Sequence, residues 1–381
     1  MKIGLIGAGR LGICLALLME NAGYDVLVSD IREDYVKNLN NKIISSTEPF
    51  VQEHLKQAKY LEATTNNRKV IQECNIIFTL VATPSLDDGS YDITNVWNVV
   101  KDFQETENVN GKTLVIGCTT NPGDCKLFQD QLSSYGVNVV YNPEFIAQGS
   151  IIKDLTHADM VLLGGDNSEV LENLSAIYKK IQVNKPIISV MSSTAAEIVK
   201  IAINCFMTTK ISFANMIGEV LILSGLENEI ELVLESIASD SRIGSKYLNF
   251  GFGFGGPCLP RDNRAFGKYA EKLGLKYNLG TTTDDFNNEH AKFLKNYFIH
   301  KNINNIPFHF EYISYKKGTD ILTESQQYKL CLDLLQSGYE VYVSDNSHII
   351  EQVEGLLKNL YGDKIHFVEP PKTINTFAIK L

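Results

Sequence analysis

The sequence predicts an α/β protein: an N-terminal, Rossmann-like doubly wound sheet, then a central domain built on a long helix, then an abbreviated Rossmann-like C-terminal domain. Three observations support this. Short β-rich runs alternate with longer helix-compatible segments in the first half, a long helical pattern follows, and a pattern near the start recurs near the end. With 381 residues, two or three domains are expected, because single cores stop growing at roughly 250 to 300 residues.

The β-rich runs of the first half are expected to form a parallel sheet, because the segments between them are long enough to cross over as helices. The expected strands are Ile3–Ile6, Asp25–Ser29, Asn75–Val81, Thr113–Gly117, Val137–Tyr141 and Met160–Leu163.

A glycine-rich segment between the first two strands indicates a dinucleotide-binding site. It reads Gly7-Ala8-Gly9-Arg10-Leu11-Gly12, and the second strand ends at Asp30. Gly7 suits a tight turn, Gly9 lets a pyrophosphate approach the following helix, and Gly12 allows close packing. A carboxylate at Asp30 accepts hydrogen bonds from ribose hydroxyls and repels a ribose phosphate, so NAD is preferred to NADP. Arg32, two residues later, weakens that preference.

A long helical pattern runs from Ser193 to Gly225. A capping box over Thr194–Glu197 is expected to start it, and Gly225 to end it. Lys200 and Asn204 are four residues apart, so they share one face of this helix amid apolar neighbours.

One internal repeat predicts a second Rossmann-like unit. Gly23–Asp30 recurs, with conservative changes, as Gly338–Asp345, and each copy follows a leucine-rich, helix-like run. The second copy has no glycine fingerprint, so its strand ends are expected to take a nucleotide carried by a substrate. The predicted domains are a dinucleotide-binding domain (1–190), a central helical domain (191–300) and a C-terminal domain (301–381).

Cys258 lies in a glycine- and proline-rich segment, Gly255–Asp262. A single cysteine is commonly a small buried apolar residue. Together with a dinucleotide fingerprint, however, a thiol indicates a dehydrogenase that holds an aldehyde as a thiohemiacetal and oxidises it to a thioester. Arg261 is placed to favour the thiolate.

The composition excludes several classes of protein. A net charge of −10 argues against nucleic-acid binding. We expect no membrane span and, because the chain begins in a strand, no signal peptide. The seven cysteines and seven histidines show no disulfide framework and no metal-ligand spacing, so we expect a cytoplasmic protein without a metal site.

Several separated motifs together resemble the UDP-glucose/GDP-mannose dehydrogenase family. In chain order they are Gly7–Gly12, Thr83-Pro84 with Asp88-Gly89, Cys118–Gly123, Asn142–Phe145, Lys200 with Asn204, Arg242–Gly244 and Gly253–Asp262. The resemblance implies a four-electron oxidation of a nucleotide sugar's primary alcohol to a carboxylate with two NAD, and UDP-glucose is the expected substrate.

The resemblance also implies residue roles. Cys258 would be the nucleophile, Lys200 and Asn204 would stabilise negative charge on oxygen, Asp262 with Thr119 would hold a water, and Glu144 would act in acid–base chemistry. Thr83, Thr119 and Arg261 would lie on the cofactor side. Substrate contacts would come from Glu144, Phe145, Lys200, Asn204, Tyr247, Leu248, Asn249, Phe250, Gly251, Gly255 and Lys316, and from Arg242 of a neighbouring subunit, which implies a homodimer.

The chain departs from the family pattern at several positions. Gln148 replaces a second acid, Thr323 replaces an arginine, and Arg261 replaces a lysine; the C-terminal domain is also expected to be short. Three alternatives stay open at this point. They are oxidation of GDP-mannose or an acetamido sugar nucleotide, a single-step β-hydroxyacid dehydrogenase, and a nucleotide-sugar-binding protein without turnover.

Overall fold

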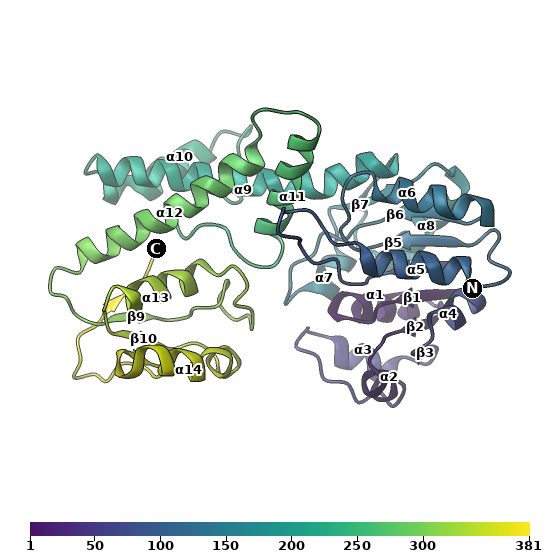
Figure 1. Ribbon diagram of the computed structural model, residues 1–381, viewed down its shortest axis with the longest axis horizontal. Helices are drawn as coiled ribbons and strands as arrows, with labels where there is room; N and C mark the ends of the chain where they lie inside the picture. Colours follow the sequence, from purple (N-terminus) through teal and green to yellow (C-terminus); the bar gives the residue numbers. More distant parts are fainter. The chain divides into compact units, whose positions relative to one another are not determined.

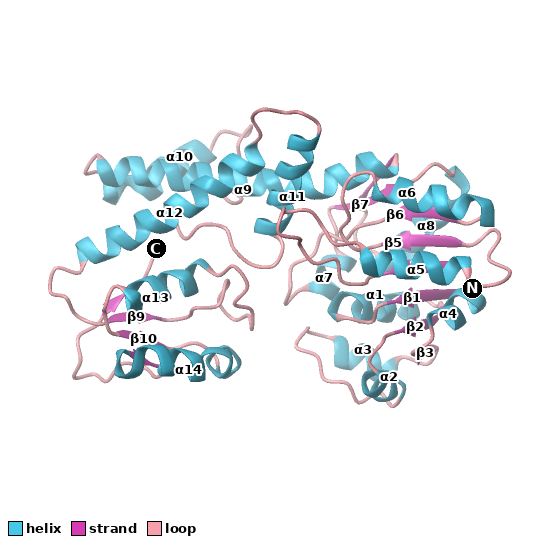
Figure 2. Ribbon diagram, viewed as in Figure 1, coloured by secondary structure: helices cyan, strands magenta, loops and turns pink.

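The computed structural model describes residues 1–381. The chain forms two compact units, Met1–Lys200 and Ile201–Leu381. Figures 1 and 2 show that strands and helices alternate through the first unit, whereas the second begins with long helices and ends in a small sheet. The division into three domains at residues 190 and 300 stays a prediction.

The first unit is built on an eight-stranded sheet with the order β3-β2-β1-β4-β5-β6-β7-β8. Its strands are β1 Lys2–Ile6, β2 Asp25–Ser29, β3 Leu61–Thr64, β4 Ile76–Thr79, β5 Thr113–Ile116, β6 Asn138–Tyr141, β7 Met160–Gly164 and β8 Ile187–Met191. The expected strands all form, so the predicted α/β doubly wound fold is confirmed. Strands β3 and β8, the half-exposed edges of the sheet, were not predicted. Strand β3 lacks a continuous apolar run, whereas β8 is apolar except for Ser189 and was overlooked.

The expectation of a purely parallel sheet is wrong at one place. Strands β6 and β7 pair in antiparallel fashion, joined through Tyr141 and Gly164, and the other neighbours are parallel. The sequence does not reveal this change, because a fully buried strand has the same apolar pattern in either direction.

Helices cover both faces of this sheet (Figure 1). Successive strand residues alternate between the faces: Val26 and Val28 join one apolar core, and Leu27 joins the other. The helices are α1 Arg10–Asn21, α2 Glu33–Asn40, α3 Val51–Gln57, α4 Asn67–Glu73, α5 Thr94–Gln104, α6 Asp124–Leu132, α7 Ile151–Thr156 and α8 Ser168–Ile181, with a 3-10 turn at Ser133–Tyr135.

The long helix α9 spans Ser193–Leu223. It ends as expected: Gly225 is left-handed, and the Leu226 N–H bonds to the Leu221 carbonyl. The predicted capping box is wrong, because the helix already begins at Ser193 and the Glu197 carboxylate bonds to Thr120 and the start of α6. By length and composition alone, α9 is long and apolar enough to cross a membrane. The same test is passed by core helices of soluble proteins, and α9 is partly buried.

The second unit continues with helices and then forms a four-stranded sheet, in the order β11-β10-β9-β12, in which all neighbours are parallel. The strands are β9 Phe308–Phe310, β10 Val341–Val343, β11 Ile365–His366 and β12 Phe377–Ala378. The helices are α10 Ile230–Ala238, α11 Leu259–Lys272, α12 Leu279–Lys301, α13 Gln326–Gln336 and α14 Ser347–Tyr361, with 3-10 turns at Glu227–Glu229 and Gly362–Lys364.

The internal repeat is reproduced in three dimensions. Gly23 and Gly338 both end a helix in the left-handed conformation, with φ of 88° and 91°. The repeated aspartates play the same part: Asp30 accepts a hydrogen bond from the Ala8 N–H, and Asp345 accepts from Ile313 and Ser314, in each case the loop after the neighbouring strand. The prediction of a second Rossmann-like sheet is therefore confirmed.

Candidate active site

The glycine fingerprint forms a cradle at the carboxyl end of β1. Gly7 has a φ of 98°, and a Cβ there would lie 2.7 Å from the Leu80 carbonyl oxygen. A Cβ on Gly12 would lie 2.0 Å from the Gly7 carbonyl oxygen. A Cβ on Gly9 would instead project into open space, which is the place where a pyrophosphate needs to approach the backbone. The cavity beside this loop measures about 530 Å³, which lies within the range of roughly 300 to 1,000 Å³ that is usual for small-molecule sites.

That cavity is lined by residues from three strand ends. Leu11 and Asp30 line it together with the glycines, and Arg10 and Arg32 contribute their charges. Burial alone would raise the pKa of Asp30, but hydrogen bonds from Arg32 and from the Ala8 N–H outweigh burial and lower it. The donor set and the open space at Gly9 therefore fit a dinucleotide.

Two candidate threonines meet beside the next strand ends. The hydroxyl of Thr83, after β4, donates to the backbone carbonyl of Thr119, after β5, at 2.8 Å. Thr83 is buried and Thr119 is half-buried. The hydrogen bond fixes the two loops against each other, and the carboxyl ends of such strands are where α/β proteins bind ligands.

Glu144 follows β6, and Tyr178 of α8 holds its carboxylate. The Tyr178 hydroxyl lies 2.7 Å from Glu144 Oε1 and 2.5 Å from Asn142 Oδ1. Removal from water raises the pKa of Glu144 to about 7, although the hydrogen bond from Tyr178 and the charge of Lys200 oppose the rise. A carboxyl group with that pKa can both accept and give a proton near neutral pH.

Lys200, on α9, lies beside the same loop. Its Nζ donates to the Glu144 backbone carbonyl at 2.9 Å and stands 4.8 Å from the centre of the Phe145 ring. The first unit thus brings Lys200 against Glu144 and Phe145, although Lys200 is 56 residues from Glu144 in the sequence. Gln148, in the same loop, accepts a hydrogen bond from Arg10 at 3.0 Å.

Sequence reasoning missed two residues that hold these loops. Tyr178 carried no signal, because a tyrosine on an amphipathic helix is ordinary. Glu197 accepts from the Thr120 hydroxyl at 2.8 Å and from the Gly123 and Cys125 N–H groups at 2.7 and 2.9 Å. Its position among apolar residues of the long helical pattern was a usable signal, because a carboxylate buried there requires several donors.

Cys258 lies at the amino end of α11, in the N-cap position, and its side chain is exposed. The first peptide groups of a helix favour negative charge on such a side chain. The neighbouring charges are arranged around Asp262: Asn204 donates to it through Nδ2 at 2.6 Å, and Arg261 Nε lies 3.5 Å from it. The second unit therefore brings Asn204 and Asp262 together at the start of the helix that carries Cys258.

The remaining predicted substrate contacts are spread over the second unit. Leu248 is buried, Tyr247 and Asn249 are exposed, and Phe250 is half-buried. The backbone groups of Gly251 are used internally, since its N–H bonds to Asn215 and its carbonyl to His290. Gly255 faces the Glu324 carbonyl, where a Cβ would lie only 2.4 Å away. Arg242 is 86% exposed and pairs with Asp240, and Lys316 is exposed.

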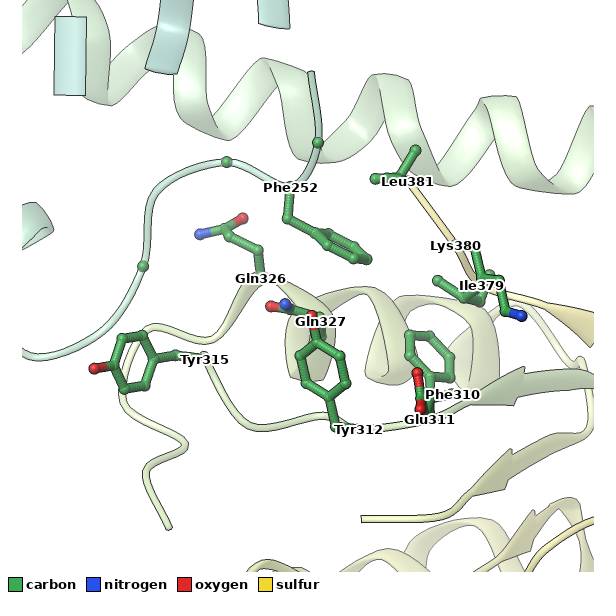
Figure 3. Close-up of a pocket in the computed structure, with 13 residues that line it drawn as sticks. Phe252, Phe310, Glu311, Tyr312, Tyr315, Gln326, Gln327, Ile379, Lys380 and Leu381 are labelled. Carbon is green, nitrogen blue, oxygen red and sulfur yellow. The ribbon is translucent and has the colours of Figure 1, made fainter. Parts of the chain in front are cut away.

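A second cavity, of about 480 Å³, lies at the carboxyl ends of β9 and β12. Figure 3 shows aromatic side chains around it, with Gln326 and Gln327 at the amino end of α13. The Gln326 Nε2 donates to the Phe254 carbonyl at 3.3 Å, whereas its Oε1 is buried and has no hydrogen-bond donor. The residues that line this cavity include Phe252, Phe310, Glu311, Tyr312, Tyr315 and Lys380.

Comparison with known families agrees with this geometry in both units. Residues 1–182 match the NAD binding domain of the UDP-glucose/GDP-mannose dehydrogenase family, and residues 194–289 match its central domain. The chain belongs to this family. The resemblance seen in the motifs is therefore confirmed, and so is NAD as the cofactor of the first domain.

Relatives in this family carry UDP-glucose 6-dehydrogenase names. The enzyme AglM of Haloferax volcanii is 28% identical over 356 residues, covering 90% of this chain and 82% of the relative. The enzyme of Rickettsia felis is 32% identical over 277 residues, covering 71% of this chain and 61% of the relative.

Solved structures of two dehydrogenases have a similar fold. A UDP-glucose dehydrogenase from Pyrobaculum islandicum superposes with a TM-score of 0.85 at 26% identity, covering 98% of this chain and 87% of that one. A UDP-D-ManNAc dehydrogenase from Pyrococcus horikoshii shares the fold, with a TM-score of 0.79 at 20% identity and coverage of 100% and 99%.

Proposed function

We propose that the protein oxidises UDP-glucose to UDP-glucuronate with two NAD, through a covalent intermediate on Cys258. The observation that supports this most directly is the exposed Cys258 at the amino end of α11, in a chain whose first domain belongs to an NAD-binding family. NAD supplies one property, the acceptance of a hydride at its nicotinamide ring.

The first oxidation removes a hydride and a proton from the C6 alcohol and yields an aldehyde. Glu144 is the candidate proton acceptor, because its pKa of about 7 leaves a large fraction ionised at neutral pH. The Lys200 ammonium carries three N–H donors, and one of them holds the Glu144 carbonyl. The others stabilise negative charge as it develops on the substrate oxygen.

The second oxidation takes place at the same sugar carbon while it is bonded to the Cys258 sulfur. The Cys258 thiolate adds to the aldehyde carbon, the oxygen takes a proton, and a thiohemiacetal forms. Loss of a second hydride and of that proton gives a thioester. Water then adds to the thioester, the thiolate leaves, and the carboxylate is released. Asp262, with Thr119, is the candidate for holding this water. Asn204 uses one amide N–H on Asp262, which leaves its second N–H for the developing oxyanion.

The sugar nucleotide itself is assigned by similarity to relatives that are named for UDP-glucose. The cavity at the ends of β9 and β12 is the proposed place of the nucleotide, because aromatic side chains and the unpartnered Gln326 oxygen suit a base. Thr323 stands where the family pattern has an arginine, so position 323 offers no guanidinium to a pyrophosphate. A panel of UDP-glucose, GDP-mannose and acetamido sugar nucleotides therefore belongs in the first assay.

The deciding experiment combines stoichiometry with mass spectrometry. We expect two NADH for each sugar oxidised, and a transient sugar adduct on the peptide that contains Cys258. The Cys258→Ser variant should bind both ligands and form no uronate. Cys331→Ala, at a buried cysteine of the C-terminal sheet core, is the matched control. One NADH per sugar, or normal uronate formation by Cys258→Ser, would remove the covalent step.

We also propose that the protein is a cytoplasmic homodimer. Five apolar side chains at helical spacing on α9 are exposed, which is unusual for a monomer. They are Phe206, Phe213, Met216, Val220 and Leu223. Light scattering after gel filtration should give twice the chain mass, and replacing Phe206 and Val220 by serine should halve it. A wild-type monomer at micromolar concentration would contradict the dimer.

A further inference from the structure

The Asp30 carboxylate is saturated by its own protein. Oδ1 accepts from the Arg32 N–H at 3.1 Å and from Arg32 Nε at 2.7 Å. Oδ2 accepts from the second Arg32 nitrogen at 2.8 Å and from the Ala8 N–H at 3.2 Å. A carboxylate has about four lone-pair sites, so all of the sites through which Asp30 would bind ribose hydroxyls are taken.

This pairing changes the charge at the end of β2. An unpaired aspartate at this position repels a 2′-phosphate and so selects NAD. Here the aspartate and Arg32 form a bidentate pair whose net charge is zero. The guanidinium also lies over the Tyr35 ring, 4.1 Å from its centre, and Arg32 lines the dinucleotide cavity.

A separate cavity of about 220 Å³ adjoins these groups in the same unit. Arg32 and Arg10 line both this cavity and the dinucleotide cavity. Four hydroxyl-bearing residues also line the smaller cavity, together with apolar residues. Two guanidinium groups and several hydroxyls are the donors that bind a phosphate, and no carboxylate lines this cavity. The hydroxyl-bearing residues are Tyr35, Ser45, Ser46 and Thr47.

We propose that this cavity, between Arg32, Arg10 and the Ser45–Thr47 segment, is a phosphate site, and that it lets the domain bind a dinucleotide with a 2′-phosphate as well as NAD. The inference concerns coenzyme choice and does not depend on which sugar is oxidised. It goes beyond NAD binding, because it adds a second coenzyme. An arginine near the end of the second strand is the usual group that accommodates a 2′-phosphate.

The test is the affinity of the full-length protein for the two reduced coenzymes, measured by calorimetry without sugar. Wild type should bind NADPH within about tenfold of NADH. Arg32→Ala removes a charged hydrogen-bond donor and exposes the Asp30 charge, so the Kd for NADPH should rise by about 10- to 100-fold. The Kd for NADH should stay the same or fall, because Asp30 becomes available to the ribose.

Controls separate a phosphate site from a folding effect. Arg68→Ala, at a partly exposed arginine paired with Glu105 outside the cavity, should change neither Kd. The Ser45→Ala, Ser46→Ala double variant keeps the Arg32 pair and should weaken NADPH alone. Adenosine 2′,5′-bisphosphate should bind more tightly than AMP. A wild-type preference for NADH above about 100-fold, or the same NADPH-to-NADH ratio in Arg32→Ala, would overturn the proposal. Neither result would touch the proposed oxidation of UDP-glucose.

Discussion

Replacing Glu144 by glutamine should stabilise the first unit, and the gain should depend on pH. An ordinary glutamate has a pKa near 4.5, whereas burial raises that of Glu144 to about 7. The folded state therefore resists ionisation that the unfolded chain accepts. The loss in free energy of unfolding caused by this charge is absent below pH 4.5, grows between pH 4.5 and 7, and is constant above pH 7.

The size of the effect follows from these two values. One pKa unit corresponds to 1.36 kcal/mol, so the full cost of the charge is about 3 kcal/mol, and between pH 5 and 8 it changes by about 2 to 3 kcal/mol. Glutamine keeps the size of the side chain and an acceptor for Tyr178, and it never ionises. Any loss from imperfect packing is the same at both pH values and cancels in the comparison.

Trp97 gives a local signal for this measurement, because it is the one tryptophan of the chain and packs against Phe128 within the first unit. Urea unfolding of wild type and Glu144→Gln, followed by its fluorescence at pH 5 and pH 8, should show a difference that grows by about 2 to 3 kcal/mol. Glu172→Gln, at an exposed position on α8, should show no such growth. An equal difference at both pH values would refute the assignment of a raised pKa to Glu144.

Three further predictions concern the loops around the site. Tyr178→Phe removes the hydrogen bond that lowers the pKa of Glu144. The rise of kcat/KM with pH, which follows ionisation of Glu144, should therefore shift to higher pH by about 1 to 2 units; an unmoved profile would make Tyr178 purely structural. Gly12→Ala places a Cβ 2.0 Å from the Gly7 oxygen and should weaken NADH binding at least about tenfold by calorimetry, which near-normal affinity would contradict. Lys200→Ala should reduce kcat by about 100-fold or more and alter the Kd of NADH little; unchanged turnover would exclude a role in charge stabilisation.

The α/β fold, the dinucleotide fingerprint and the internal repeat could be predicted because their signals are local. Alternating apolar runs, the Gly7–Gly12 fingerprint and the repeat of Gly23–Asp30 each lie within a few consecutive residues. Family membership followed from motifs of the same kind. Edge strand β3 escaped prediction because it lacks an apolar run, whereas the apolar residues of β8 were a usable signal that was overlooked. The direction of β7 leaves no mark on composition.

Protonation and charge were decided by contacts between distant segments. Tyr178 meets Glu144 across 34 residues, and Glu197 meets Thr120 across 77. Even Arg32, two residues from Asp30, could be assigned to that carboxylate only once the backbone had turned after β2. A sequence specifies which groups are present, because periodicity and turn chemistry act locally. Which donor reaches which buried carboxylate depends on the packing of helices onto the sheet, and that packing sets the pKa of Glu144 and the charge at the coenzyme site.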